Sequence, residues 1–188
     1  IEGLGPVSVI VTGGAHTCAL DVDANLYCWG ESAGGALGCE IEAGKPVAKP
    51  ALIEWDGPRI SHLSAGVMGT CVITEEHQAV CWGTNEFAQF GVPPSQIPLL
   101  PTPSFVGFQL DAMDLGTAHG CIISDGGIVR CAGLNDTGAV AEDLHTGTSV
   151  ATLQRAFLDH LCYQRGRHFA GATRSARAPG CWTCWARC

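Results

Sequence analysis

The sequence is poor in basic residues and has no long apolar run. Ten lysines and arginines stand against 18 aspartates and glutamates, so the 188 residues carry a formal net charge of −8. Phosphate binding needs a basic footprint, and this balance therefore argues against a nucleic-acid partner. No hydrophobic stretch is long enough to cross a bilayer, so we expect no membrane partner.

The sequence also lacks the patterns that usually carry chemistry. It has no glycine-rich phosphate loop after a strand, no nucleophile elbow and no carboxylate pair in a recurring place. Cys181 and Cys184 have the spacing of a redox pair or half a zinc site, but the βαβ context and further ligands at the usual spacing are missing. Asp21 to Asn25 begins like a calcium loop, yet Leu26 stands where that loop needs glycine. We expect no enzymatic activity, no cofactor and no metal site.

Cysteine and glycine, by contrast, are abundant, with 11 and 25 copies. Six of the cysteines form three pairs, each with a spacing of ten residues, and the pairs repeat after 53 and then 50 residues. The pairs are Cys18 and Cys28, Cys71 and Cys81, and Cys121 and Cys131. A period near 50 residues indicates a repeat architecture in which each copy is one supersecondary unit.

Each cysteine pair brackets a predicted β-hairpin. Short apolar or β-branched runs flank a polar turn, most clearly at residues 125–127. A turn centred near residue 23 places Cys18 opposite Cys28, with Cα atoms roughly 4.5–5.5 Å apart, which is within the span of a disulfide. The sequence therefore predicts one disulfide across each hairpin, and its cysteine content favours an oxidising compartment. The alternative is six reduced cysteines buried in the core.

The residues around each hairpin resemble a known repeat. The first copy runs from Gly13-Gly14-Ala15-His16 through Trp29-Gly30 to the stretch GGALG at residues 34–38. This pattern resembles the repeat of the regulator of chromosome condensation family, in the cysteine-containing variety found in extracellular proteins. The resemblance covers about residues 5–145 in three consecutive copies. It implies a β-propeller in which each copy supplies about one four-stranded blade, and the family typically closes with seven.

We therefore expect an all-β fold, a partial β-propeller of three repeat blades of about 50 residues each, with an irregular C-terminal tail. Two copies depart from the family pattern: Gly69 stands where the first copy has His16, and Ala132 stands where the other copies have Trp29 and Trp82. We interpret the histidines as hydrogen-bonded blade elements and the tryptophans as packing residues. Three blades leave open edges, which propellers avoid, so we expect further blades of the same or another chain to cover them.

The chain divides into a repeat domain, residues 1–159, and an unassigned basic, cysteine-rich tail, residues 160–188. All 18 acidic residues lie at or before Asp159, which gives the two parts net charges of −13 and +5. We interpret the tail as a disordered segment or as the product of a reading-frame error. The proline-rich segments 39–60 and 92–111 are predicted to be outer strands with connecting loops. Residues 149–161 fit either a short helix or an outer strand.

These features predict a non-enzymatic protein–protein interaction or scaffolding module, extracellular or in the secretory pathway, with a protein partner that the sequence does not identify. The resemblance leaves two alternatives, a guanine-nucleotide exchange factor for a small GTPase and a secreted enzyme inhibitor of the propeller type. The predicted partner contacts lie on the loop that follows each hairpin, because binding residues concentrate on loops held by a rigid scaffold. They are Glu31, Ser32, Leu37, Asn85, Glu86, Phe87, Asn135 and Asp136. Asn135 also begins a glycosylation sequon, Asn-Asp-Thr.

Overall fold

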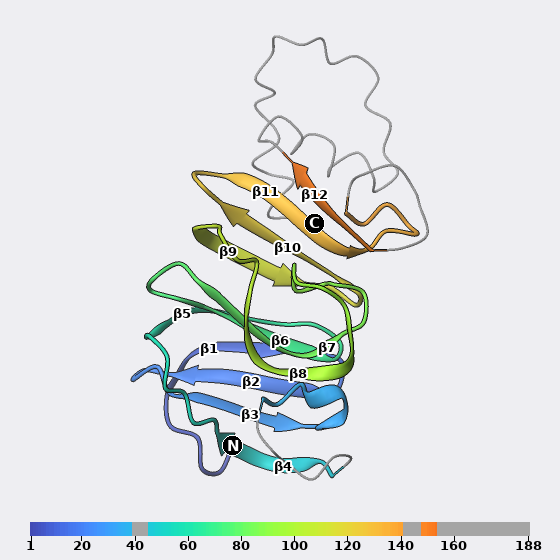
Figure 1. The fold of residues 1–188 in the computed structure, drawn as a ribbon. Helices are drawn as coiled ribbons and strands as arrows, with labels where there is room; N and C mark the ends of the chain where they lie inside the picture. The colour runs from blue at the N-terminus through green and yellow to red at the C-terminus, as the bar shows by residue number, and fades with distance from the viewer. Residues whose placement is uncertain (39–44, 141–147, 154–188) are drawn as a thin grey trace, which may run out of the picture.

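The computed structural model of the chain describes residues 1–38, 45–140 and 148–153. Within these residues, twelve strands form three antiparallel four-stranded sheets, each in the order of the sequence. Figure 1 shows the three sheets stacked one after another, from the blue N-terminal sheet to the yellow and orange third sheet. We call them blades 1, 2 and 3. The predicted all-β, three-bladed fold is confirmed.

Each blade takes its strands from one copy of the repeat. Blade 1 consists of β1 (Val7–Thr12), β2 (His16–Asp21), β3 (Leu26–Gly30) and β4 (Val47–Leu52), with a short 3-10 turn, η1 (Ala33–Gly35), after β3. Blade 2 consists of β5 (Ile60–Ala65), β6 (Gly69–Thr74), β7 (Ala79–Asn85) and β8 (Ser95–Ser104). Blade 3 consists of β9 (Leu110–Leu115), β10 (His119–Ser124), β11 (Ile128–Leu134) and β12 (Thr148–Leu153).

The middle hairpin of each blade has the register that the turn positions predict. The cysteines of each pair are directly opposed, with Cα atoms 4.2, 4.1 and 4.1 Å apart in blades 1, 2 and 3. This spacing is slightly below the expected range, and each pair of sulfur atoms lies at disulfide distance. The same geometry in three copies follows from the equal number of residues between the cysteines.

The first strand of each blade is the inner strand and the fourth is the outer one. β1 contacts β5, and β5 contacts β9, whereas β4, β8 and β12 lie at the far edges of their sheets. β8 contains Pro98, Pro101 and Pro103. Proline has no backbone N–H and is tolerated on an edge strand, as predicted for this segment. β12 shows that the start of the ambiguous segment 149–161 is an outer strand.

One glycine in each copy is required by the close approach of two backbones. The glycine two residues after the second cysteine of each pair has a left-handed φ of 109°, 102° and 130° at Gly30, Gly83 and Gly133. A Cβ atom there would lie 2.4–2.5 Å from a carbonyl oxygen of the preceding loop, contributed by Ala15, Met68 and Ala118. No side chain fits in that space, so the glycine of the repeat is a backbone requirement.

The core lies between the blades. We call the side of a blade that faces the next blade its leading face, and the side that faces the previous blade its trailing face. The cysteine pairs lie on the leading faces.

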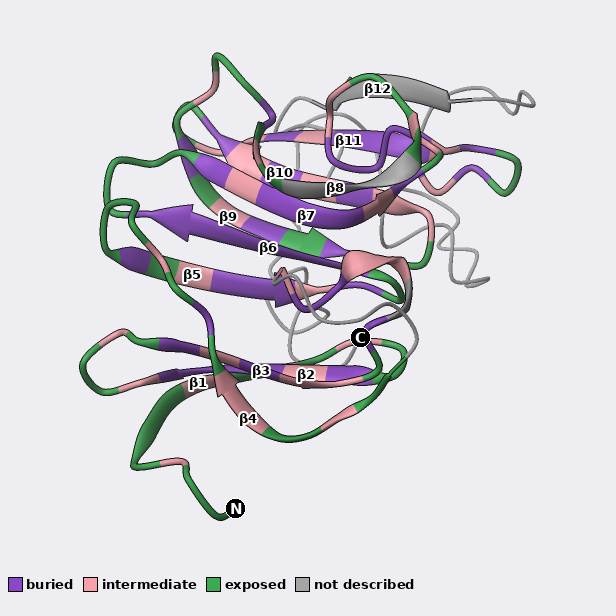
Figure 2. Ribbon diagram, turned by 60° about the horizontal axis from the view of Figure 1, so that its bottom comes forward, coloured by how far each residue is buried: buried purple, intermediate pink, exposed green. Residues whose placement is uncertain are grey.

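The two interfaces are apolar. Between blades 1 and 2, the leading-face residues Cys18, Leu20, Leu26, Cys28 and Leu37 pack against the trailing-face residues Ile60, Leu63, Val72 and Trp82. Between blades 2 and 3, Cys71, Ile73, Cys81 and Phe90 pack against Leu110, Met113, Leu115 and Ile122. In Figure 2 the strands β6 and β7 of the central blade are largely buried, whereas β1 at the end of the stack is partly exposed.

Several predictions concern residues outside the described part of the chain. These are the boundary at residue 159, the tail at residues 160–188 with its Cys181 and Cys184, and the end of the segment 149–161. They stay predictions. Among the described residues, no helix has the length and apolar character that a membrane crossing requires.

Candidate functional site

The structure divides the eight predicted partner contacts into two groups. Glu31, Glu86 and Asp136 are exposed, and Phe87 is half-buried. The other four, Ser32, Leu37, Asn85 and Asn135, are buried, with 8% of the side chain exposed at Ser32 and 1% or less at the others. The burial of these four side chains leaves the exposed residues as the better candidates, and the partner contacts themselves stay predictions.

The buried polar residues shape the loop. Asn85 accepts a hydrogen bond from the Phe90 N–H at 3.0 Å, and Asn135 accepts one from the Val140 N–H at 3.1 Å. In both loops the bond spans five residues and ends at a buried apolar side chain. Ser32 takes the equivalent place in blade 1 and donates to the Lys45 carbonyl at 3.0 Å. These side chains satisfy backbone groups that the turn would otherwise leave unpaired.

Burial also determines whether the asparagine of the glycosylation sequon is accessible in the folded blade. The Asn135 side chain is fully buried, and its carboxamide oxygen is engaged with the Val140 N–H. An oligosaccharyl transfer needs an exposed asparagine, because the attached sugar is bulky and solvated. Asn135 is therefore a structural residue in the folded blade, and the sequon is not a usable acceptor there.

The remaining candidate surface is the end of the stack that carries the loops after β1 and β3 and their equivalents. We call it the loop end. It presents the carboxylates of Glu31, Glu86 and Asp136. In the neighbouring loop after β5, Val67 and Met68 are 41% and 42% exposed. Apolar side chains among acidic ones form a surface that is suited to a protein partner rather than to a polyanion.

The opposite end carries the turns of the three hairpins and is strongly acidic. We call it the turn end. Two of its carboxylates pair with arginine, Glu75 with Arg59 at 3.5 Å and Asp125 with Arg130 at 3.0 Å. The carboxylates at this end include those of Asp21, Asp23, Glu54, Asp56, Glu75, Glu76 and Asp125. The negative charge at this end would repel a phosphate backbone.

The segment that begins like a calcium loop is a side-chain-capped turn. Hydrogen bonds hold the pKa of the Asp21 carboxyl below its usual value, first from the Asn25 side chain and then from the backbone N–H groups of Asn25 and Asp23. This is the geometry of an aspartate-stabilised turn. No group of three or more potential metal ligands occurs among the residues that the structure describes.

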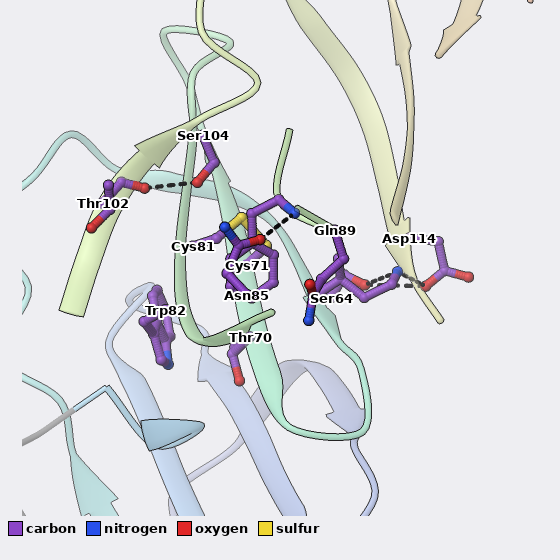
Figure 3. The surroundings of a disulfide bond; sticks show 12 residues. Ser64, Thr70, Cys71, Cys81, Trp82, Asn85, Gln89, Thr102, Ser104 and Asp114 are labelled. Atoms are coloured by element: carbon purple, nitrogen blue, oxygen red, sulfur yellow. Dashed lines mark hydrogen bonds between the residues drawn. A yellow bond between two sulfur atoms is a disulfide. The ribbon is translucent and has the colours of Figure 1, made fainter. Parts of the chain in front are cut away.

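A polar junction joins blades 1 and 2 within their apolar interface. The Ala36 carbonyl of blade 1 accepts hydrogen bonds from Trp82 Nε1 at 2.9 Å and from Thr70 Oγ1 at 2.8 Å. His16 Nε2 lies 2.9 Å from the same hydroxyl. Because Thr70 has one hydroxyl proton and donates it to Ala36, His16 must donate from a protonated Nε2. Burial lowers the pKa of His16, which keeps the ring neutral. In Figure 3, Trp82 and Thr70 extend toward the blue ribbon of blade 1, away from the Cys71–Cys81 bond.

Blades 2 and 3 are joined by a different set of contacts. Ser64 donates to the Asp114 carboxylate at 3.1 Å and accepts the Leu115 N–H at 3.0 Å. His62 and His77 contact the carbonyls of Met113 and Leu110 at 3.0 and 2.9 Å. Reasoning from the sequence missed both junctions. The repeat alignment contained one signal for the first, because Thr17 and Thr70 occupy the same position, as do Trp29 and Trp82.

The chain was compared with proteins of known sequence. Protein RCC1 from Candida albicans is 24% identical over 196 residues, covering 89% of this chain and 41% of the relative. Protein pim1 from Schizosaccharomyces pombe is 24% identical over 182 residues, covering 83% and 34%. The probable E3 ubiquitin-protein ligase HERC6 from Homo sapiens is 27% identical over 100 residues, which is 50% of this chain and 9% of that protein. No family model matches the sequence.

Solved structures show the same fold at low identity. Prp20p from Saccharomyces cerevisiae superposes with a TM-score of 0.73 at 22% identity, covering 84% of this chain and 40% of that chain. Human WBSCR16 superposes with a TM-score of 0.67 at 19% identity, covering 79% and 39%. The chain thus spans 34–41% of the length of the two fungal sequence relatives.

The fold and the repeated cysteine hairpins define the class: consecutive blades of a β-propeller. Within that class, the resemblance to the regulator of chromosome condensation family is confirmed, since Protein RCC1 and pim1 are among its sequence relatives and Prp20p, the yeast RCC1, has the same fold. These likenesses support a protein-interaction module.

Proposed function

We propose that this chain is a non-enzymatic protein-binding and scaffolding module of an extracellular or secreted propeller. The observation that carries the proposal is the set of three cysteine pairs at disulfide distance. Two of the pairs are fully buried between blades, at 0% exposure. Disulfides persist in oxidising compartments and are rare in the cytosol, so the three pairs support a location outside the cytosol.

The first experiment counts thiols. Protein isolated without reductant is unfolded in denaturant and titrated before and after reduction. With six of the 11 cysteines in disulfides, we expect five reactive thiols before reduction and 11 after it. Eleven thiols in both titrations would contradict the proposed location and favour the nucleotide-exchange alternative, in which the protein works in a reducing compartment.

The nucleotide-exchange alternative is suggested by one particular relative, Prp20p. The structure of Prp20p was described together with its binding to Gsp1p and to histones, and this binding belongs to Prp20p. Because this chain spans 40% of that one, its own partners are a separate question. Measuring nucleotide release from a small GTPase in the presence of the chain tests the alternative, and we expect no acceleration. The inhibitor alternative is tested by capturing a partner from the secreted fraction and assaying that partner for enzymatic activity.

A second experiment tests the loop end as the binding surface. The double variant Glu86→Lys and Asp136→Lys reverses two exposed charges on equivalent loops of blades 2 and 3. The matched control, Asp23→Lys with Glu76→Lys, makes the same change in charge at the turn end. We expect the first variant to lose partner capture and the second to retain it. Equal capture by both variants would place the binding surface elsewhere.

A further inference from the structure

Each end of the blade stack exposes residues that the interior interfaces bury. On the trailing face of blade 1, Val7 and Ile10 are 39% and 56% exposed. The equivalent positions in the other blades are buried, at 4% and 3% in blade 2 and 1% and 4% in blade 3; these are Ile60, Leu63, Leu110 and Met113. The trailing face of blade 1 is therefore an interface surface without a neighbour among the described residues.

The same face repeats the donors of the polar junction. Thr17 and Trp29 are directly opposed in blade 1, as Thr70 and Trp82 are in blade 2. Thr70 and Trp82 both donate to the Ala36 carbonyl of the preceding blade. The Thr17 hydroxyl and the Trp29 indole are only partly buried, and they have no hydrogen-bond partner within residues 1–38, 45–140 and 148–153.

The leading face of blade 3 repeats the acceptor side of the junction. His119 occupies the place of His16, and its ring lies under Gly116 as the His16 ring lies under Gly13. Ala139 occupies the place of Ala36 in the loop that follows the hairpin. Cys121 and Ile123 are half-buried, whereas their equivalents in blades 1 and 2 are buried. This face also has no neighbour in the described part of the chain.

Among the faces of the three described blades, only these two complement each other in the manner of blades 1 and 2. The interface between blades 2 and 3 lacks the histidine, threonine and tryptophan of this junction. Gly69 stands in place of the histidine, Gly120 in place of the threonine and Ala132 in place of the tryptophan. A blade like blade 3 could not supply the threonine hydroxyl and the tryptophan indole that His119 and Ala139 are placed to meet. Blade 1 of another copy supplies both of them.

We propose that a second copy of this chain docks head to tail, with the trailing face of its blade 1 on the leading face of blade 3. In this contact Trp29 and Thr17 donate to the Ala139 carbonyl of the partner subunit, and His119 of the partner subunit donates to Thr17. Such an interface is heterologous, so repeated docking gives a closed ring or an open series of subunits. The inference rests on the scaffolding role proposed above but not on the location, and the thiol count is independent of it.

The test uses two blocking variants of the full chain, Ile10→Arg on the trailing face and Ile123→Arg on the leading face. The molar mass of each is measured by light scattering at the concentrations where the unmodified chain is assembled. We expect each variant to be monomeric alone. An equimolar mixture should form a one-to-one dimer, because each variant retains one intact face. Val22→Arg, at an exposed position in the β2–β3 turn, should assemble like the unmodified chain.

A finer variant tests the polar contact itself. Trp29→Phe keeps the ring and removes the N–H, and we expect the dissociation constant of the assembly to rise about 2- to 12-fold, the effect of one hydrogen bond. Far-UV circular dichroism verifies folding, and Ile10→Gln and Ile123→Gln replace any arginine variant that does not fold. An unmodified chain that is monomeric throughout, or a mixture of folded blocking variants that stays monomeric, overturns the proposal.

Discussion

The two interfaces of this molecule join blades of the same backbone geometry with different side chains. Between blades 1 and 2, His16 donates to the Thr70 hydroxyl, and Thr70 and Trp82 both donate to the Ala36 backbone carbonyl. Between blades 2 and 3, the first of these positions is Gly69, and the ring of Phe90 fills the space, so that a Cβ atom on Gly69 would lie 2.6 Å from Phe90 Cζ. A histidine there and a phenylalanine at residue 90 exclude each other.

The remaining replacements follow the same logic. Gly120 stands where blade 2 has Thr70, and a Cβ atom there would lie 2.5 Å from the Gln89 carbonyl oxygen, the equivalent of the Ala36 carbonyl oxygen. The blades approach too closely at that point for a hydroxyl to be inserted. Ser64 and Asp114 supply the polar contact instead. The departures from the repeat pattern therefore fit one another across the interface between blades 2 and 3, and they do not indicate a blade that is poorly formed.

The largest expected effect is a difference in stability between variants of Trp82 and Trp29, which share one position of the repeat. Trp82→Ala should lower the free energy of unfolding by about 3–5 kcal/mol, because it opens a cavity beside Gly38 and removes a donor to Ala36. Trp29→Ala should cost less than about 1 kcal/mol in the dilute, unassembled chain, because none of the described blades covers it there. Urea unfolding followed by circular dichroism measures both. Equal losses would show that the position matters within its own blade and not across the interface.

A swap between the interfaces should have the next largest effect. Gly69→His should cost about 1–3 kcal/mol, because its Cβ collides with Phe90. Adding Phe90→Leu, which is the residue of blade 1 at the equivalent position, should recover part of that loss. The coupling energy from the double-mutant cycle should exceed about 0.5 kcal/mol. Strictly additive costs would contradict the mutual exclusion of the two side chains.

Removing one hydroxyl from each junction should sharpen the comparison further. Thr70→Val leaves the buried His16 N–H without an acceptor and should cost about 1–3 kcal/mol. Ser64→Ala should cost about 0.5–1.5 kcal/mol, because the Leu115 N–H that Ser64 accepts also donates to Asp114 at 3.0 Å, and water can replace the bond to the exposed Asp114 carboxylate. The urea midpoints of the two variants measure the loss of stability. A larger loss for Ser64→Ala than for Thr70→Val would contradict the prediction that the Thr70 hydroxyl contributes more.

The smallest expected effect is a pH dependence that belongs to the first junction. The folded state holds the pKa of His16 below its ordinary value near 6.5, so below that pH the unfolded chain binds a proton that folded His16 does not. Stability from this group is complete above pH 6.5 and falls as the pH drops toward the folded pKa, by at most about 1.4 kcal/mol per unit. The loss should be absent from the pH profile of His16→Gln, and identical slopes for the two proteins would refute the assignment.

Much of the fold could be predicted because its determinants are local. The ten-residue spacing and polar turn between Cys18 and Cys28 set the hairpin register, and the prolines of residues 92–111 indicate an edge strand. The site was harder to predict, since polar loop residues resemble binding residues in any sequence. Asn85 and Asn135 lie in exposed-looking loops, but their side chains turn inward to bond the backbone five residues later.

The sequence by itself determined the repeat, the paired cysteines and the strand order within each blade, because each depends on residues close together in the chain. Only the tertiary structure decided which side of each hairpin is buried, which carbonyl accepts from Thr70 and Trp82, and which two faces have no neighbour among the described residues. Those features arise between blades whose residues are about 50 positions apart in the chain, and the shape of a neighbouring blade is not encoded in the blade that meets it.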